Sequence, residues 1–158
     1  MDKIDLMFKE AYEYLKPYWN PKDGDIIYFE YTEKDKDFWK MKYEEAGKEY
    51  EPKDGWWYVD NNIEFKNNGT DRYSNHLKKE AKAWKARQED LQEIFRNKTG
   101  NPDPLGIMIL ATEWFKRRKY HDNKSIWNDM GAMWLCFVME TCYNKTWDGK
   151  SWAPLEDR

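Results

Sequence analysis

The sequence predicts an α+β domain: an N-terminal helix, an antiparallel sheet of about four strands, and a C-terminal half of about three helices that ends in a short hairpin. Apolar residues recur at helical spacing near the start and after residue 74, whereas short aromatic and β-branched runs between turn residues lie in the middle. Aromatic residues make up 18% of the chain, so a core of large rings can form although 36% of residues are charged. We expect one domain over 1–158, with the helix and antiparallel meander in 1–71 and the helices and hairpin in 72–158.

The first helix is expected over residues 4–16. Asp2 or Asp5 is suited to begin it, and Pro17 ends it. Five apolar residues recur at the spacing of one helical face: Leu6, Met7, Ala11, Tyr14 and Leu15.

Four strands are expected between this helix and residue 71. Turns rich in Pro, Asp and Gly precede the first and third of them, and a pair of asparagines precedes the fourth. In the second, Trp39, Met41 and Tyr43 alternate with Phe38 and two lysines, as in a half-buried antiparallel strand. The expected strands cover residues 25–31, 38–43, 56–59 and 63–65.

Three helices are expected in the second half. Ser74 caps the first, from about 74 to 97, and Ser125 caps the last, from 126 to about 143. The middle helix covers 105–119; prolines open it and a basic cluster suits the negative end of its dipole.

The chain then predicts a hairpin. Asp148 and Gly149 form a strong two-residue turn signal, which Trp147 and Lys150 flank. Trp147 and Trp152 are expected to fold back on the last helix as a lid, with a ligand platform as the alternative.

Several features indicate a soluble protein of a reducing cytoplasm. No apolar run approaches the roughly 20 residues of a membrane helix, and the acidic N-terminus does not have the form of a signal peptide. Cys136 and Cys142 lie six residues apart in an expected helix and point away from each other, so we expect two unbridged, buried thiols.

The charge distribution argues against general electrostatic binding to DNA. The net charge is -3 and the pI is about 5.5, whereas such binding favours a strongly basic domain. The charge is uneven, however: residues 1–71 carry 11 Lys and Arg against 18 Asp and Glu, and residues 72–124 carry 13 against 7. The basic middle segment can hold a few phosphates, so a nucleic-acid-binding accessory protein stays an alternative.

No familiar catalytic motif is present in the sequence. The two histidines, His76 and His121, are far apart, and no zinc-protease, paired-cysteine, serine-elbow or phosphate-loop pattern occurs. We therefore expect no metal and no cofactor, and favour a surface loop around His121 and Asp122. A hydrolase with an unfamiliar site near His121 is a further alternative.

The candidate binding residues combine aromatic rings with cations. Rings beside Arg or Lys bind nucleotides by stacking, while the cation meets the phosphate. The alternatives are that these rings cover the helices from the sheet side and that the basic cluster is a solvated helix end. The candidates are Trp39, Trp56, Tyr58, Arg72 and Tyr73, with Arg117, Arg118 and Lys119 for phosphate capture.

Two segments carry a resemblance. The first runs from Trp84 through Arg87 and Gln88 to Glu93; the second includes the apolar run that starts at Trp134 and the Trp-Asp-Gly of 147–149, and ends at Trp152. Both resemble small accessory proteins of Gram-positive bacteriophages and prophages, for which no functional residue can be carried over.

The resemblance implies a role in the cytoplasm of a bacterial host. We expect a non-enzymatic binding protein that counters bacterial immunity by sequestering a small nucleotide signal or a host protein. The surplus of aromatic residues also makes a homodimer the expected assembly.

Overall fold

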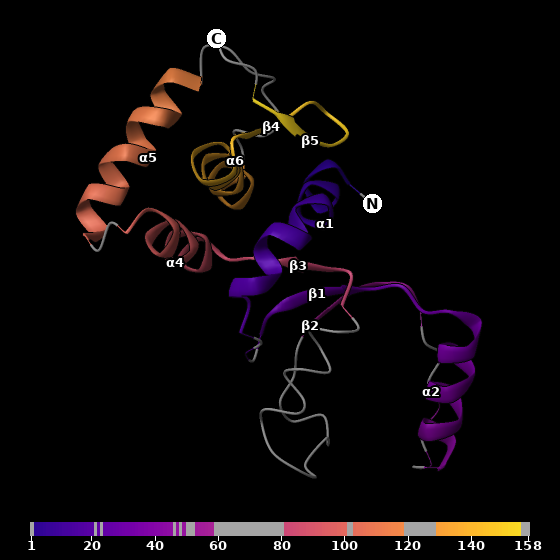
Figure 1. Ribbon diagram of the computed structural model, residues 1–158. Helices are drawn as coiled ribbons and strands as arrows, with labels where there is room; N and C mark the ends of the chain where they lie inside the picture. The colour runs from indigo at the N-terminus through magenta and orange to yellow at the C-terminus, as the bar shows by residue number, and fades with distance from the viewer. Residues whose placement is uncertain are drawn as a thin grey trace. The chain divides into compact units, whose positions relative to one another are not determined.

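A computed structural model describes residues 2–20, 22, 24–45, 47, 49, 53–58, 81–100, 103–118 and 129–155, without the side chains of Lys42, Trp57 and Tyr58 (Figure 1). The described chain is α+β, as the sequence predicts. It divides into two compact units, one of residues 1–19 with 85–158 and one of residues 20–84. A single domain over 1–158 stays a prediction, and each unit is described by itself.

The first unit is a group of helices with a hairpin. Helix α6 packs against α1, α4, α5 and the strand β4 that follows it. Its buried side chains include Trp134, Phe137 and Met139, each at most 1% exposed. The elements are α1 (Lys3–Leu15), the short 3-10 helix η1 (Lys16–Tyr18), α4 (Gln88–Thr99), α5 (Pro104–Arg118), α6 (Met130–Tyr143), β4 (Lys145–Trp147) and β5 (Trp152–Pro154).

Helix α1 confirms the expected N-terminal helix and selects Asp2 as its cap. The Asp2 carboxylate accepts a hydrogen bond from the Asp5 backbone N–H at 2.7 Å, which satisfies one of the free donors at the helix start. The buried face comprises Met7, Phe8, Ala11, Tyr12 and Leu15.

The helix predicted over 74–97 is wrong in its described first part. Residues Ala83–Lys85 form strand β3, and α4 begins at Gln88 after Arg87, whose backbone is extended. The Asp90 carboxylate accepts from the Arg87 backbone N–H at 3.0 Å and thereby sets the helix start. Residues 74–80, with the predicted cap Ser74, lie outside the described residues.

Helix α5 confirms its prediction closely, whereas α6 begins later than predicted. Asp129, predicted to lie within the helix, has an extended backbone, and its carboxylate accepts from the Ala132 N–H at 2.8 Å, so it caps a helix that begins at Met130. The predicted cap Ser125 lies outside the described residues. Among the described residues, no helix has the length and apolar character that crossing a bilayer requires.

The terminal hairpin is present, but its loop has four residues instead of two. Trp147 pairs with Trp152, and the Asp148 carboxylate accepts from the backbone N–H groups of Lys150 and Ser151 at 2.7 and 2.8 Å. These hydrogen bonds hold the pKa of Asp148 below its ordinary value. The side chain of Asp148 therefore closes a four-residue loop, which is wider than the two-residue turn that the sequence Asp148-Gly149 predicts.

Trp152 acts as a lid. It contacts α1, although it lies in the hairpin that follows α6 in the sequence. Its indole is 7% exposed and donates to the backbone carbonyl of Met7 at 3.0 Å. The ring of Trp147 lies 5.2 Å from that of Trp152, centroid to centroid. The hairpin thus ties residues near the C-terminus to the first helix.

Replacing Trp152 by Phe is expected to lower the free energy of unfolding by about 2 kcal/mol, because one buried hydrogen bond and part of the ring volume are lost. Trp147→Phe is the matched control. The Trp147 indole N–H is buried with no hydrogen-bond acceptor among the described residues. Removing this N–H therefore breaks no hydrogen bond, and the free energy of unfolding should change little. Urea unfolding of both variants measures the difference, and equal losses would contradict the role of the Trp152 bond.

The second unit contains a sheet and one described helix. Strand β1 (Ile26–Phe29) lies between β2 (Gly55–Tyr58) and β3, and pairs with β2 in antiparallel register, Tyr28 opposite Trp56. These strands confirm the first and third predicted ones. The fourth, at 63–65, lies outside the described residues.

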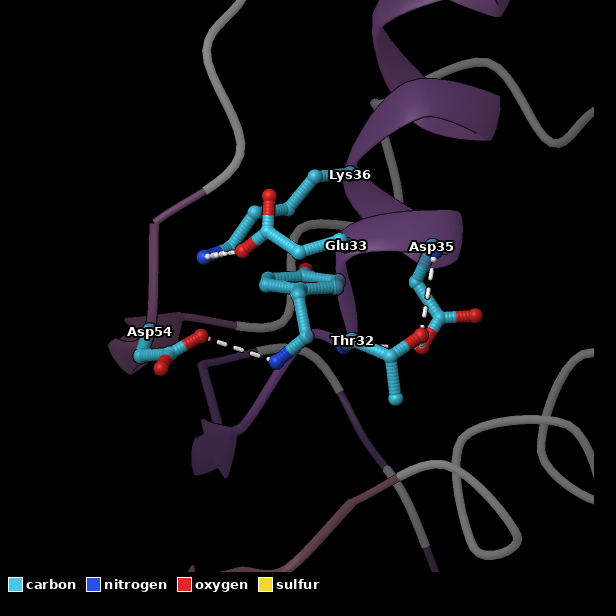
Figure 2. A network of polar contacts seen from close by, with 6 residues as sticks. Thr32, Glu33, Asp35, Lys36 and Asp54 are labelled. Atoms are coloured by element: carbon cyan, nitrogen blue, oxygen red, sulfur yellow. Dashed lines mark hydrogen bonds and ion pairs between the residues drawn. The ribbon is translucent and has the colours of Figure 1, made fainter.

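The strand predicted over 38–43 is wrong, because these residues belong to helix α2 (Glu33–Glu45). Thr32 begins the helix: its hydroxyl accepts from the Asp35 N–H at 3.2 Å, and the Asp35 carboxylate accepts from the Thr32 N–H at 3.0 Å. This reciprocal cap is drawn in Figure 2, where Glu33 also pairs with Lys36. The alternation of apolar and polar residues over 38–43 suggested a strand. The capped start at Thr32 and the charged, helix-forming residues of this segment favour the helix instead.

Candidate functional site

One carboxylate joins three elements of the first unit. Glu140 of α6 accepts hydrogen bonds from Arg118 of α5, with Nε at 3.2 Å and also from Nη2, and from the indole of Trp114 at 2.9 Å. The hydroxyl of Thr146 in β4 donates to the same carboxylate at 3.1 Å. The side chains of Arg118 and Glu140 are only 15% and 10% exposed, so this is a largely buried, two-point ion pair.

This pairing bears on the predicted phosphate site. Arg118 is held by Glu140 through Nε and Nη2, and its guanidinium also lies 5.8 Å from the ring centre of Trp114, so this cation is already paired within the fold. Arg117 is exposed, and its Nε donates to the carbonyl of Glu113 at 3.4 Å. Lys119 lies outside the described residues. Of this predicted basic cluster, Arg117 is the described residue most accessible to a phosphate.

Glu140→Gln is expected to lower the free energy of unfolding by about 3 kcal/mol, because it leaves a largely buried guanidinium without its counter-charge. Glu113→Gln, which alters an exposed acid on α5, should change it by less than about 0.5 kcal/mol. Urea unfolding at neutral pH compares the two. Similar small effects in both variants would mean that the Arg118 pair contributes little.

A second cluster gathers tyrosine rings and lysine ammonium groups. Tyr14 and Tyr143 meet edge to face, with ring centres 5.3 Å apart. Lys98 lies over Tyr143 at 4.8 Å and over Tyr18 at 5.8 Å, and Lys145 lies over Tyr14 at 5.5 Å. We call these five residues the tyrosine–lysine cluster: Tyr14, Tyr18, Lys98, Tyr143 and Lys145.

Helix ends bring this cluster together. Tyr18 follows α1 in η1, Lys98 is in the last turn of α4, and Tyr143 is the last residue of α6. Gly100 and Asn144 stop the latter two helices in left-handed conformations, with φ of 68° and 53°. Three helix C-termini, the negative ends of their dipoles, therefore converge where the lysines lie.

The cluster is partly buried and its rings are fixed. The Tyr143 hydroxyl donates to the backbone carbonyl of Tyr14 at 2.8 Å. Burial raises the pKa of the Tyr143 phenol above its ordinary value, and Tyr18 and Cys142 add to the rise. Burial also raises the pKa of the Cys142 thiol, although the Thr141 hydroxyl and Lys98 oppose this. The rings of Tyr14 and Tyr143 are thus held against each other, and the Tyr143 hydroxyl lies in a poorly solvated environment.

The raised pKa of Tyr143 predicts a loss of stability at alkaline pH. Above the ordinary pKa of 10.0 the unfolded chain releases this proton while the folded chain keeps it, so the free energy of unfolding falls as pH rises. Tyr143→Phe removes the proton and should make this fall less steep. Urea unfolding at several pH values from 8 to about 11 tests it, with identical slopes as the contradicting outcome.

The other predicted site residues belong to the second unit. Trp39 lies on α2, half-buried, with Phe38 at 5.6 Å between ring centres. Trp56 lies on β2, half-buried and 5.3 Å from Tyr28 across the strand pair. Tyr58 ends β2. Arg72 and Tyr73 lie outside the described residues, so the predicted group of five stays a prediction.

The remaining candidates from the sequence are the region of His121, a metal site and the two cysteines. His121 and Asp122 lie outside the described residues. Among the residues that the structure covers, no three His, Cys, Asp or Glu side chains gather to hold a metal ion. Neither Cys136 nor Cys142 is in a disulfide, as predicted, but both are half-buried instead of fully buried.

The sequence did not predict the tyrosine–lysine cluster. Each helix end carried a visible signal, such as Pro17 after Tyr14 and Gly100 after Lys98, but no local pattern showed that these ends meet. No family model, curated protein or solved structure matches the chain.

Proposed function

We propose that the chain is a non-enzymatic binding protein whose tyrosine–lysine cluster holds a small anionic aromatic ligand, with a nucleotide as the best fit. The single observation that carries the proposal is the gathering of three tyrosine rings and two lysines at the ends of three helices. The rings offer stacking surfaces and the ammonium groups offer charge for phosphate. The setting is the cytoplasm of a phage-infected bacterium, where binding a nucleotide signal would counter host immunity.

Ring rigidity supports this ligand class. The hydrogen bond from Tyr143 to the Tyr14 carbonyl and the edge-to-face contact fix two rings before a ligand arrives. A fixed ring loses little conformational entropy on binding. Each base stacked on such a ring contributes about 1–3 kcal/mol.

The lysines have two roles that compete. As cations at helix C-termini they offset the negative ends of the dipoles, worth about 0.3–1 kcal/mol each. Lys98 lies over two rings, and Lys145 donates to the backbone carbonyl of Trp152 at 3.4 Å as well as lying over Tyr14, so a phosphate must attract ammonium groups that already have partners. Lys98 is exposed and can contact both, so the expected affinity is moderate and falls with added salt.

Binding of mono-, di- and cyclic nucleotides to the full chain, measured by isothermal titration calorimetry, tests the proposal. We expect Lys98→Ala and Lys145→Ala each to raise Kd by about tenfold, which is about 1.4 kcal/mol. Tyr18→Leu, which keeps apolar bulk but removes the ring, should have a similar effect. Lys150→Ala on the hairpin loop is the matched control and should leave Kd unchanged.

Three outcomes would overturn the proposal. The first is nucleotide binding that none of the three cluster variants weakens, and the second is no binding at low salt. The third is turnover: if nucleotide released from the protein by heat differs by mass spectrometry from the one supplied, the chain is an enzyme. Tight binding of DNA or RNA that falls steeply with salt would instead favour the nucleic-acid-binding alternative.

A further inference from the structure

Helix α5 presents large aliphatic side chains to solvent. Leu105 is 67% exposed, Met108 42%, Ile109 52% and Leu110 44%. Leu105, Met108 and Ile109 lie at the i, i+3 and i+4 positions of one helical face, and Leu110 extends the group, about 100° further round the helix than Ile109. We call these four residues the aliphatic face of α5.

The opposite side of the helix already forms part of the core. Ile107 and Ala111 are buried, and α5 contacts α4 and α6 within the first unit (Figure 1). Hence α5 is apolar on both sides over its first two turns. A contiguous group of exposed aliphatic side chains is typical of a protein interface, because each Å² removed from water gains about 25 cal/mol.

The charges beside this face have a defined order. Asp103 precedes the helix, and its carboxylate accepts from the backbone N–H groups of Leu105 and Gly106, both at 3.1 Å. Lys116 and Arg117 are exposed in the last turn. Glu113, three residues before Lys116, is also exposed, but the two cations outnumber it, so the face is acidic at its start, aliphatic in the middle and net basic at its end.

This order is complementary to itself when the helix is reversed. A parallel copy would place basic ends together and acidic ends together. An antiparallel copy places Lys116 of each chain near Asp103 of the other, brings the aliphatic residues into contact and opposes the two helix dipoles. Self-complementarity of one patch is what a two-fold dimer interface requires.

We propose that the aliphatic face of α5 binds the same face of a second copy of this chain, with the two helices antiparallel about a two-fold axis. Pairing position 103 with position 116 places the axis beside Ile109 and Leu110. The patch is small: a helix of 15 residues is about 22 Å long, whereas a standard interface buries about 800 Å² per partner. The dimer is therefore weak, and its population rises with concentration.

Sedimentation velocity of the full chain, from about 1 µM to about 1 mM, measures this. We expect the mass to rise with concentration from one chain of 19.4 kDa to twice that value. Ile109→Asp places two carboxylates side by side at the axis and should keep the chain monomeric. Met41→Asp is the matched control, since Met41 lies in α2 and is 47% exposed; it should dimerise as the unaltered chain does.

Cysteine cross-linking tests the orientation. Near the axis, Ile109→Cys should form a disulfide with its copy under mild oxidation. In the antiparallel pair the two copies of residue 105 lie about 13 Å apart along the helices, too far for a bridge, so Leu105→Cys should not. The unaltered chain, with its thiols at Cys136 and Cys142, gives the background.

Each possible result decides the proposal. A mass of one chain at every concentration overturns the proposed dimer, even if another molecule binds the aliphatic face of α5. A dimer that survives Ile109→Asp places the interface elsewhere and also overturns it. Cross-linking at both Leu105→Cys and Ile109→Cys indicates parallel helices and overturns the antiparallel arrangement. None of these measurements depends on nucleotide binding.

Discussion

The burial of α6 is the constraint on which the first unit depends. Six of its fourteen residues are buried, and α1, α4, α5 and β4 all contact it. A helix that is apolar on most sides must be covered on most sides. Helices α1 and α4 are amphipathic and α5 contributes Ile107 and Ala111 to that cover, while the hairpin closes the unit by resting Trp152 on α1.

Much of the aromatic surplus is used in this packing. Phe137 of α6 stacks on Phe95 of α4 at 4.9 Å and meets Trp114 of α5 at 5.8 Å, both between ring centres. Trp134 contacts Phe115 and Phe137 edge to face. Rings fill large volumes with few side-chain torsions, so a chain rich in charged residues can still form a dense core. An aromatic-rich sequence therefore does not by itself indicate exposed rings.

Local signals explain which elements the sequence predicted. Helices α1 and α5 have apolar periodicity together with clear ends, and both were predicted within about two residues. The helix predicted across 81–87 is wrong because Ala81 and Trp84 also fit a helical stripe. The strand that contains Trp84 follows from pairing with β1, which is a long-range contact. The aliphatic face of α5 was equally invisible, since the sequence shows apolar residues but not which of them remain uncovered.

The candidate site could be predicted only in its residue types. Rings beside cations were anticipated, yet the described cluster uses other residues than those proposed from the sequence. Their meeting depends on where three helices end in space, which follows from tertiary packing. Lys98 and Tyr14 are 84 positions apart, and no short pattern connects them.

One short segment connects the cluster to the rest of the fold. Glu140 and Tyr143 lie one turn apart on α6, so the turn that holds the end of α5 also carries the central ring of the cluster. In β4, consecutive side chains point to opposite faces. Accordingly Lys145 reaches the ring of Tyr14, while Thr146 donates to Glu140. The position of the cluster is therefore fixed by the same buried carboxylate that fixes α5, the helix that carries the proposed dimer surface.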